Sequence, residues 1–513
     1  MKKLFSIIMI ASVLFLSNCG KNWLDVNKDP NNPETATAEL VFPAGVISVA
    51  SQVGGYYALV GGFWSQYFAQ SNAANQYKEL DQYNPTSTDF NSQWREMYAG
   101  ALSDLQYVID DAEANENWTY FLLGTVMQAY GFTVMVDFYD NVPYFEAFQG
   151  ASDFNFSPVY DNGDVIYADL IKRIDIALKK ERNILTEGQV KGDILFGIPK
   201  VYGDYDAYVA DNNGDIQYEI WSQFANTLKL KMYLRMAYAD PGVAQAGISK
   251  MYTDGDVFLG QDAFLDIFVN ATGQRNPLYE SNVQLLNVGT NLRTSTTIFN
   301  YFDANSDPRM TSVVGSGTNP MPQGGFNIAS TDLDPTTVCV YQQSPTDPVY
   351  FISEVESYLL QAEAVARGWG IGDDQALYNS AVTADFSRKG YSVAGFIGVG
   401  DVYEYPASGT LDEKIEAITM AKWAAFAGTS QTLEAFFETN RNGYPQVGTE
   451  SAWDDAAADY NGSYVPGFLM YSMEGTTAGK FPKRMLYPQD EINLNTNVPA
   501  QTSITDKVWW DKK

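Results

Sequence analysis

The feature that most constrains the fold of this chain is the stretch Pro348–Gly370, PVYFISEVESYLLQAEAVARGWG. Its apolar side chains recur at steps of three and four residues, which places them on one face of a helix. These side chains are Val355, Leu359, Ala362 and Ala366. Ser353 followed three residues later by Glu356 is the pattern of a capping box, and Gly368 supplies a stop. The stretch therefore predicts a buried structural helix with no chemistry of its own, whose small residues let another helix approach closely.

The composition allows a large core and excludes several classes of partner. Of the 513 residues, 45% are hydrophobic and 14% aromatic, including 34 tyrosines. That is enough both to fill a core and to leave aromatic surfaces for binding. The formal net charge is −30, and there is no histidine. A chain with this charge repels nucleic acids and anionic lipid headgroups, so we expect no nucleic acid as a partner.

The N-terminus predicts export and a lipid anchor. Two lysines precede an apolar run over residues 4–16, which is too short to span a bilayer and is typical of a secretory signal peptide. The run ends in LSNCG, which resembles a bacterial lipobox, although Asn18 departs from its usual small residue. We expect Cys19 to be the acylated first residue of the mature chain; an ordinary cleaved signal is the alternative. Cys339 then has no partner, so no disulfide is expected.

Helical periodicity occupies most of the chain, with two exceptions. Helices are predicted over residues 92–112, 117–138, 165–178, 219–239, 350–369, 374–387, 411–427 and 430–440, after an interrupted helical run over 36–70. Residues 71–90 lose the apolar period, and long polar loops of this kind inside compact domains are usually functional or disordered. Residues 241–345 are rich in Gly, Asn, Thr and Pro and are predicted to be irregular. The expected fold class is therefore mostly α.

Most catalytic motifs are ruled out because the chain lacks histidine, so we predict no catalytic residues, no cofactor and no metal ligands. A pair of carboxylates for glycoside hydrolysis is not excluded, because 62 acidic residues offer many pairs. Glu434 and Glu438 lie one helical turn apart, a spacing that solvated helix faces often produce. The acidic loop over 211–215 lacks the Gly and Glu of an EF-hand, because Ile216 and Ser222 occupy those positions, and an Asx turn is favoured.

What remains is a binding surface. A protein captures sugars by stacking aromatic rings on their C–H faces and by offering polar side chains to their hydroxyl groups. The polar loop over 71–90 carries such groups at suitable spacing. They are Asn75, Tyr77, Asp81 and Tyr83. For each of them, a packed or merely exposed side chain is the alternative interpretation.

Several motifs recur in one order along the whole chain. They are NWLDVNKDPNNP at 22–33, DFYDNVPYFEAF at 137–148, EIWSQFANTLKLK at 219–231, EVESYLLQAEAVARG at 354–368, KWAAFAGTSQTLEAFFETNRNGYP at 422–445 and FPKRMLYPQDEINLNTN at 481–497. Together they resemble the SusD/RagB family, which comprises outer-membrane lipoproteins of Bacteroidetes that capture nutrients for a TonB-dependent transporter. Departures occur at Asp140-Asn141, where the family has Gly-Asp, and at Ala421, Phe436, Asn440 and Asn442.

The resemblance implies a fold and a set of partners. The fold would be an α-superhelix of tetratricopeptide-like helix pairs with an irregular insertion. The expected organisation is a signal peptide over 1–18, a lipid-anchored tether over 19–34 and a single domain over 35–513, with 241–345 its loop-rich portion. One face would dock on a SusC-like TonB-dependent transporter at the outer membrane, facing the cell exterior. By the same resemblance, Arg275, Tyr279 and Phe326 join the candidate ligand-binding residues.

The functional hypothesis is a non-enzymatic lipoprotein that binds nutrient oligosaccharides and delivers them to the transporter. An oligopeptide ligand is an alternative of the same type. A lipid-anchored hydrolase with a carboxylate pair and a scaffold that binds only proteins are alternatives of other classes.

Overall fold

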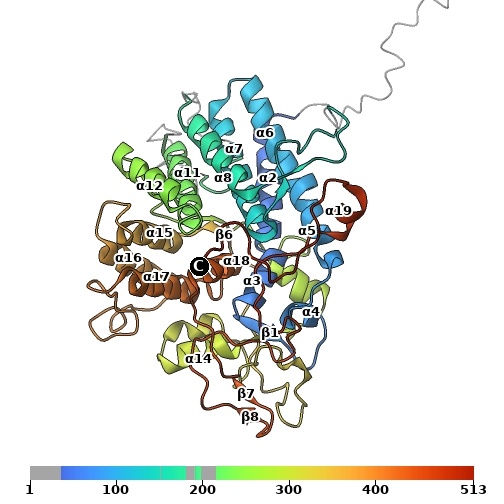
Figure 1. Cartoon of the computed structure of the whole chain (residues 1–513), viewed down its shortest axis with the longest axis vertical. Helices are drawn as coiled ribbons and strands as arrows, with labels where there is room; N and C mark the ends of the chain where they lie inside the picture. Colours follow the sequence, from blue (N-terminus) through green and yellow to red (C-terminus); the bar gives the residue numbers. More distant parts are fainter. Residues whose placement is uncertain (1–35, 151, 181–189, 191, 198–214) are drawn as a thin grey trace, which may run out of the picture.

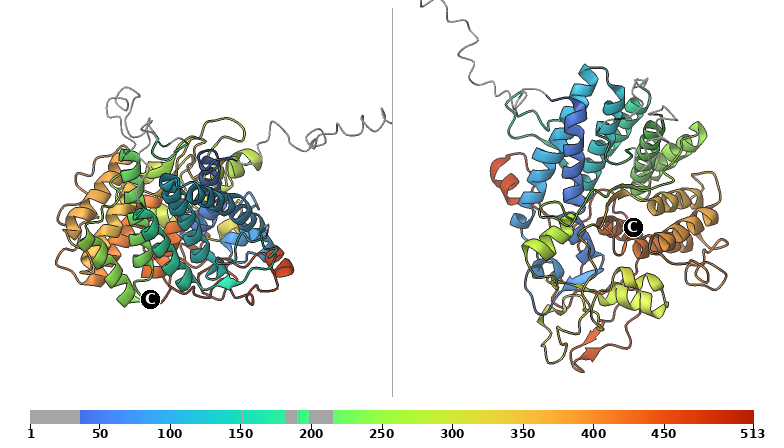
Figure 2. Two further views of the ribbon diagram at one scale, coloured as in Figure 1. Left: turned by 90° about the horizontal axis from the view of Figure 1, so that it is seen from above. Right: turned by 180° about the vertical axis from the view of Figure 1, so that it is seen from behind.

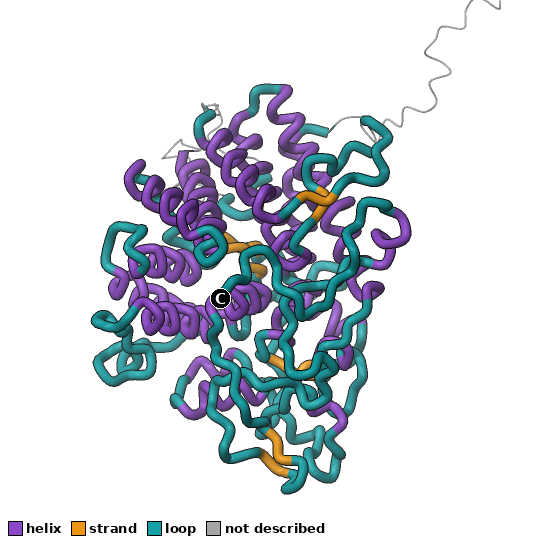
Figure 3. Tube along the Cα trace, in the orientation of Figure 1, coloured by secondary structure: helices purple, strands orange, loops and turns teal. Residues whose placement is uncertain are grey.

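The computed structural model describes residues 36–150, 152–180, 190, 192–197 and 215–513. The predicted signal peptide, Cys19, the tether and residues 211–214 lie outside the described residues. Figure 1 shows two groups of helices above and to the left of a part rich in loops, and Figure 3 shows the same division by secondary structure. The prediction of a mostly helical fold is confirmed, with only a few short strands.

The first group of helices comes from the N-terminal part of the chain. Its α-helices are α2 (Ala38–Val53), α3 (Tyr56–Trp64), α5 (Asn91–Arg95), α6 (Ser103–Ala114), α7 (Trp118–Tyr139) and α8 (Gly163–Leu178). The π-helical segment η2 (Glu96–Leu102) joins α5 to α6. Because α7 is apolar on nearly all sides, it is buried along its length, and α2, α6 and α8 pack around it.

Two stretches of the described chain, Ala38–Trp64 and Trp118–Tyr139, are long and apolar enough to cross a membrane by length and composition alone. Inside the fold, however, 72% of the apolar window in the first and 100% of that in the second are buried. This burial makes both stretches core helices.

The second group of helices comes from the middle and the C-terminal third. Its members are α11 (Asp215–Arg235), α12 (Pro241–Asp254), α15 (Glu354–Ala366), α16 (Asp374–Arg388), α17 (Leu411–Phe426) and α18 (Thr432–Asn442). Consecutive helices pack on each other: α11 on α12, α15 on α16, and α17 on α18. Helix α11 also contacts α7, α8 and α15, and so joins the two groups. This pairing of sequence neighbours is the arrangement that helix-pair repeats use to share a continuous core.

Helix α15 is the predicted buried helix. Ser353 Oγ accepts a hydrogen bond from the backbone N–H of Glu356 at 3.2 Å, which confirms the N-cap. The capping box is only half formed, because the Glu356 carboxylate contacts Lys231 and Gln431 instead of the Ser353 backbone. Val355, Leu359 and Ala362 are buried, as their spacing predicted, whereas Ala366 in the last turn is only half-buried. Gly368 follows the helix with a φ of 72°, a conformation that glycine adopts without strain.

A network of buried charges lies between α11, α15, α17 and α18. Arg235 contacts Glu434 at 2.5 Å and Glu438 at 2.7 Å, and Arg441 contacts Glu438 at 2.6 Å. Lys231 also contacts Glu434, at 2.7 Å. The interpretation of Glu434 and Glu438 as a solvated pair is wrong, because their exposed fractions are 4% and 3%. Although burial opposes ionisation, the surrounding cations, Arg441 foremost, hold the pKa of Glu438 well below its usual range.

The loop-rich portion over 241–345 is less irregular than its composition predicted. Helix α12 occupies its first 14 residues, and α14 (Thr296–Ala304) lies in its second half. Asp240 caps α12 by accepting a hydrogen bond from the N–H of Val243 at 3.1 Å, and Pro241 occupies the first helical position. The sequence pattern missed this helix because only three of its residues are buried, so its apolar stripe is short.

The remaining helical segments are single turns or little more. They are α4 (Lys78–Asp81), η1 (Ser87–Phe90), α13 (Pro277–Tyr279), η3 (Glu280–Leu285), η4 (Pro308–Ser312), η5 (Gly325–Asn327) and α19 (Gln489–Leu494). Segments α4 and η1 lie in the stretch 71–90 that was predicted to be a loop, and η3 is a second π-helical segment.

The strands of the described residues form four antiparallel two-stranded sheets. The pairs are β1 (Phe68–Gln70) with β5 (Leu292–Thr294), β2 (Val142–Pro143) with β3 (Tyr160–Asp161), β4 (Ala263–Leu265) with β6 (Val349–Ile352), and β7 (Trp453–Asp454) with β8 (Asp459–Tyr460). In the first pair, Phe68 lies opposite Thr294 and Gln70 opposite Leu292. This pairing ties the start of the polar loop to the loop-rich portion, although more than 200 residues separate them in the chain.

Candidate functional site

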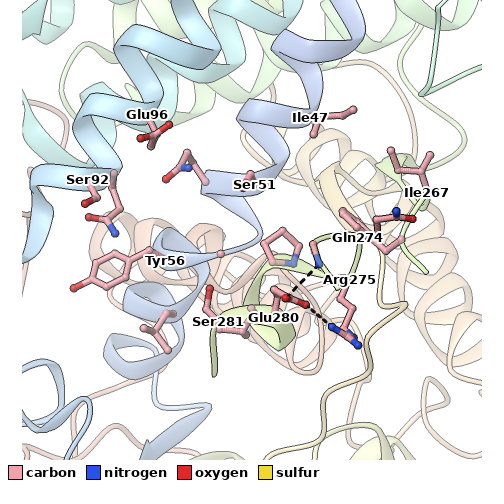
Figure 4. Close-up of a pocket in the computed structure, with 18 of the residues that line it drawn as sticks. Ile47, Ser51, Tyr56, Ser92, Glu96, Ile267, Gln274, Arg275, Glu280 and Ser281 are labelled. Carbon is pink, nitrogen blue, oxygen red and sulfur yellow. Dashed lines mark hydrogen bonds and ion pairs between the residues drawn. The ribbon is translucent and has the colours of Figure 1, made fainter. Parts of the chain in front are cut away.

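A cleft of about 590 Å³ lies between the N-terminal helices and the first half of the loop-rich portion. Figure 2 (right) shows the yellow-green segment that includes α13 beside the blue helices α2 and α3, and α13 contacts α3. Three segments line the cleft: the junction of α2 and α3, the α5–η2 helix, and the chain from Ile267 to Ser281. Tyr77 of the polar loop lines it as well. Figure 4 shows side chains from all three segments around the cavity.

The first wall is the junction between α2 and α3. The predicted interruption at Gly54-Gly55 is present, since α2 ends at Val53 and α3 begins at Tyr56. A Cβ atom at Gly54 would lie 2.3 Å from Val349 Cγ2, so the helix end can pack against β6 only if this residue is glycine. The break presents Ser51 and Gln52 of α2 and the ring of Tyr56 to the cleft.

The second wall is the α5–η2 helix. Trp94 and Met97 are buried and anchor it, while Ser92, Gln93 and Glu96 line the cleft. The carbonyl oxygen Oε1 of Gln93 is buried and accepts no hydrogen bond from the described residues. From Glu96 onwards the helix widens to π-helical geometry. Such segments are rare in proteins, and those that occur are frequently found at functional sites.

The third wall is the segment from Ile267 to Ser281, which side-chain hydrogen bonds hold in place. Asn276 Oδ1 accepts hydrogen bonds from the N–H groups of Leu278 and Tyr279 at 3.0 and 3.1 Å and so caps α13. Its amide also donates to the carbonyl oxygen of Asp347 at 3.0 Å. The second π-helical segment, η3, begins at Glu280, so a π-helix borders the cleft on this side as well.

Three partly exposed aromatic rings line the cleft: Tyr56, Tyr77 and Phe268. Tyr56 makes an edge contact with Phe90 at 6.3 Å between ring centroids, and Tyr77 does so with Phe63 at 5.9 Å. Burial raises the pKa of Tyr77 to about 12, and burial followed by the charge of Asp89 raises the pKa of Tyr56 still further. Both phenols are therefore neutral near pH 7 and available as hydrogen-bond donors.

The structure brings two of the predicted ligand residues together in this cleft, Tyr77 and Arg275. Arg275 is not free, because its Nη1 contacts Glu280 Oε2 at 3.0 Å and its Nε donates to Asn270 Oδ1 at 2.8 Å. Asn75 is exposed in the turn before Tyr77, and Tyr279 is half-buried on α13. Neither of them lines the cleft.

The other three predicted ligand residues, Asp81, Tyr83 and Phe326, are buried, with exposed fractions of 0%, 1% and 5%, and none of them lines the cleft. Asp81 is a structural acceptor. It accepts hydrogen bonds from the N–H of Gln70 at 2.9 Å, from the N–H of Gly324 at 3.1 Å and from the Gln323 amide. Burial raises its pKa to about 7, against the lowering effect of these donors. Asp81 thus connects α4 to the loop-rich portion from inside.

Sequence reasoning missed most of the cleft, including Tyr56, Gln93, Glu96 and Phe268. These residues come from segments predicted as packed helices or irregular chain, and no motif marks them. The sequence signal that could have located the cleft is the Gly54-Gly55 break in an otherwise apolar helical run, because such a break exposes a helix end.

The fold and the cleft define a mostly helical binding protein with a mixed aromatic and polar site. Comparison with known families is more specific: residues 30–471 match the family model SusD-like_2, described as "Starch-binding associating with outer membrane". The chain belongs to this SusD-like family of non-catalytic outer-membrane nutrient-binding proteins.

Solved structures of the same fold agree with this assignment. A SusD homologue from Bacteroides uniformis is 20% identical with a TM-score of 0.69, over 92% of this chain and 99% of that one. A chitin-binding protein is 22% identical with a TM-score of 0.68, over 92% and 100% of the two chains. A chitin-binding SusD homologue from Flavobacterium johnsoniae is 17% identical with a TM-score of 0.68, over 92% and 98%. No curated protein matches the chain.

Proposed function

We propose that this chain is a surface-exposed lipoprotein that binds nutrient oligosaccharides in the cleft and delivers them to a TonB-dependent transporter of the outer membrane. The observation that carries the proposal is the set of three partly exposed rings, Tyr56, Tyr77 and Phe268, beside uncharged Ser and Gln side chains in one cavity. Aromatic rings suit the C–H faces of a sugar, and the neutral donors and acceptors suit its hydroxyl groups. Two structurally similar proteins described as chitin-binding make a glycan the first ligand to test.

The remaining parts of the proposal rest on the sequence and the family. The motif around Cys19 supports a lipid anchor, and the family's association with the outer membrane supports a location where such an anchor would act. The transporter is the partner that the resemblance implies. Co-purification of the full chain with a co-expressed TonB-dependent transporter tests this part. A C19A variant tests the anchor, because loss of the anchor should release the protein from the membrane fraction.

The hydrolytic alternative is not favoured, because the chain belongs to a family of non-catalytic binding proteins. Glu434 and Glu438, the pair that the sequence offered for it, are buried and paired with cations, and neither of them lines the cleft. The oligopeptide alternative remains an outcome of the binding test.

The binding test is isothermal titration of the purified chain with neutral oligosaccharides and with oligopeptides of matched length. The variants Y77A and F268A each remove one ring from the cleft. The loss of one stacking contact is expected to weaken glycan binding by about fivefold, or about 1 kcal/mol. The variant F154A is the matched control, because Phe154 is 78% exposed and lies outside the cleft.

Circular dichroism melting curves would show whether each variant folds. Unchanged glycan affinity in folded Y77A and F268A would contradict the assignment of the cleft. If the chain bound oligopeptides and no glycan, the ligand would be an oligopeptide and not an oligosaccharide. Release of reducing ends from a glycan would contradict a non-catalytic role.

A further inference from the structure

The charged side chains that line the cleft carry a net negative charge. Among its lining residues, three side chains are charged: Glu96, Arg275 and Glu280. Arg275 and Glu280 neutralise each other in a contact of 3.0 Å, with side chains only 11% and 16% exposed. The guanidinium also donates to Asn270. An anionic ligand could therefore bind Arg275 only by separating it from a partly buried partner, which is costly.

Glu96 is the charge that remains. Its side chain is 52% exposed, and the one ion pair that it forms among the described residues is with the neighbouring Arg95, at 3.2 Å. The Arg95 side chain is 62% exposed and does not line the cleft. Because an ion pair between two exposed side chains is weak, a cationic group of a ligand can take the place of Arg95. In Figure 4, Glu96 lies across the cavity from Arg275 and Glu280.

The wall around Glu96 is also rich in hydrogen-bond acceptors. Gln93, three residues earlier, lies on the same face of the helix, and its buried Oε1 accepts no hydrogen bond from the described residues. A carboxylate can only accept hydrogen bonds, and Glu96 is the exposed acceptor of this wall, whereas Gln93 Oε1 is buried and meets a ligand only if its side chain turns toward the cleft. This wall therefore matches groups that donate hydrogen bonds, such as hydroxyl, amide N–H and ammonium, and it repels carboxylate and sulfate.

We propose that the cleft selects its glycans by charge: it binds uncharged and amino-bearing oligosaccharides and rejects uronate-containing or sulfated ones, with Glu96 as the specificity-determining residue. This inference rests on the proposed function, because it takes the ligand to be an oligosaccharide. The net charge of −30 acts in the same direction by repelling anionic polymers before contact.

The test compares three hexasaccharides of similar size by isothermal titration at about pH 6, where the amine of the second is protonated. They are N-acetylated chitohexaose, its fully deacetylated form and hexagalacturonate; neutral hexamers of glucose, xylose and mannose complete the panel. The deacetylated hexamer is expected to bind about fivefold more tightly than chitohexaose, and hexagalacturonate at least about fivefold more weakly.

The variant E96Q keeps the size of the side chain and removes its charge. It is expected to bring the affinity for the deacetylated hexamer down to that for chitohexaose, while the affinity for chitohexaose changes by less than about twofold. E113Q is the matched control, because Glu113 is exposed on α6 and lies outside the cleft. It removes the same charge and should leave the order of the three affinities unchanged.

The outcomes separate the two proposals. Binding of glycans without this order of affinities, or an order that E96Q leaves intact, would overturn the charge selectivity alone. A lack of binding to every hexamer in the panel would overturn the proposed function and the selectivity with it.

Discussion

The buried charge network between the two helix groups allows a sharp prediction of stability. The substitution R235M removes a guanidinium whose side chain is 1% exposed and which contacts three carboxylates. Its distances to Asp137, Glu434 and Glu438 are 3.1, 2.5 and 2.7 Å. Methionine fills much of the same volume beside Phe437 and Trp510, so the main change is the loss of the charge and its hydrogen bonds.

The expected magnitude follows from which carboxylates keep a cation. Glu434 still contacts Lys231, but in the described part of the chain Arg235 is the only cation that forms an ion pair with Asp137. Asp137 would retain hydrogen bonds from the hydroxyl of Tyr167 and the indole of Trp510. Removing one partner from a buried ion pair typically costs about 3–5 kcal/mol, and we expect a loss of that order in the free energy of unfolding.

The loss should also depend on pH. Burial raises the pKa of Asp137 to about 6, while Arg235 acts to lower it. Without Arg235 this pKa rises further, so a proton neutralises Asp137 more readily as pH falls. R235M should therefore cost less stability at about pH 5 than at about pH 8.

The assay is urea unfolding followed by circular dichroism at both pH values. R95M is the control, because Arg95 forms an exposed pair that contributes about 0–1 kcal/mol. The double variant R235M/D137N should recover part of the loss, since it removes the carboxylate left without a cation. A cost for R235M no larger than that for R95M would refute the argument that this network stabilises the junction of the helices.

Two further perturbations test the frame of the cleft. Burial raises the pKa of Asp81 from 3.8 to about 7, so its contribution to stability is fully present below about pH 4 and is lost as pH rises through 7. At about 1.4 kcal/mol per pH unit, this contribution to the free energy of unfolding changes by at most about 4 kcal/mol over the range. If the free energies of unfolding of the wild type and D81N changed with pH in parallel, this prediction would be contradicted. G54A places a Cβ 2.3 Å from Val349 Cγ2 and should cost about 1–3 kcal/mol and weaken glycan binding. G462A, whose Cβ would meet nothing within 4 Å, should do neither, and equal melting temperatures for the two variants would refute the packing argument.

Much of the helical frame was predictable because each helix carries its own local signals. Helix α7 is apolar on nearly every side, and α15 has its cap, its apolar face and its stop within one short stretch. Helix α12 was missed because its packed face is short, although Asp240, Pro241 and Gly255 marked both its ends. The order of the family motifs predicted the family correctly, and the match over residues 30–471 shows it.

The candidate site was much less predictable, since burial depends on what packs against a residue. Asp81 and Tyr83 stand in a polar stretch that resembles an exposed loop, yet both are buried. Gln323 and Gly324 of the loop-rich portion contact Asp81, and Tyr471 and Phe481 near the C-terminus pack on Tyr83. Glu434 and Glu438 have the spacing of a solvated helix face, yet α11 brings Arg235 against them. In each case the deciding neighbour lies more than 190 residues away in the chain.

The sequence by itself determined the helix-rich class, the absence of histidine chemistry and the family, because these depend on local patterns and on composition. Only the tertiary structure decided which side chains line the cleft. It brings Tyr56, Tyr77, Glu96 and Arg275 together from four segments. Their proximity depends on the register of β1 with β5 and on the contact of α13 with α3, which no local pattern encodes.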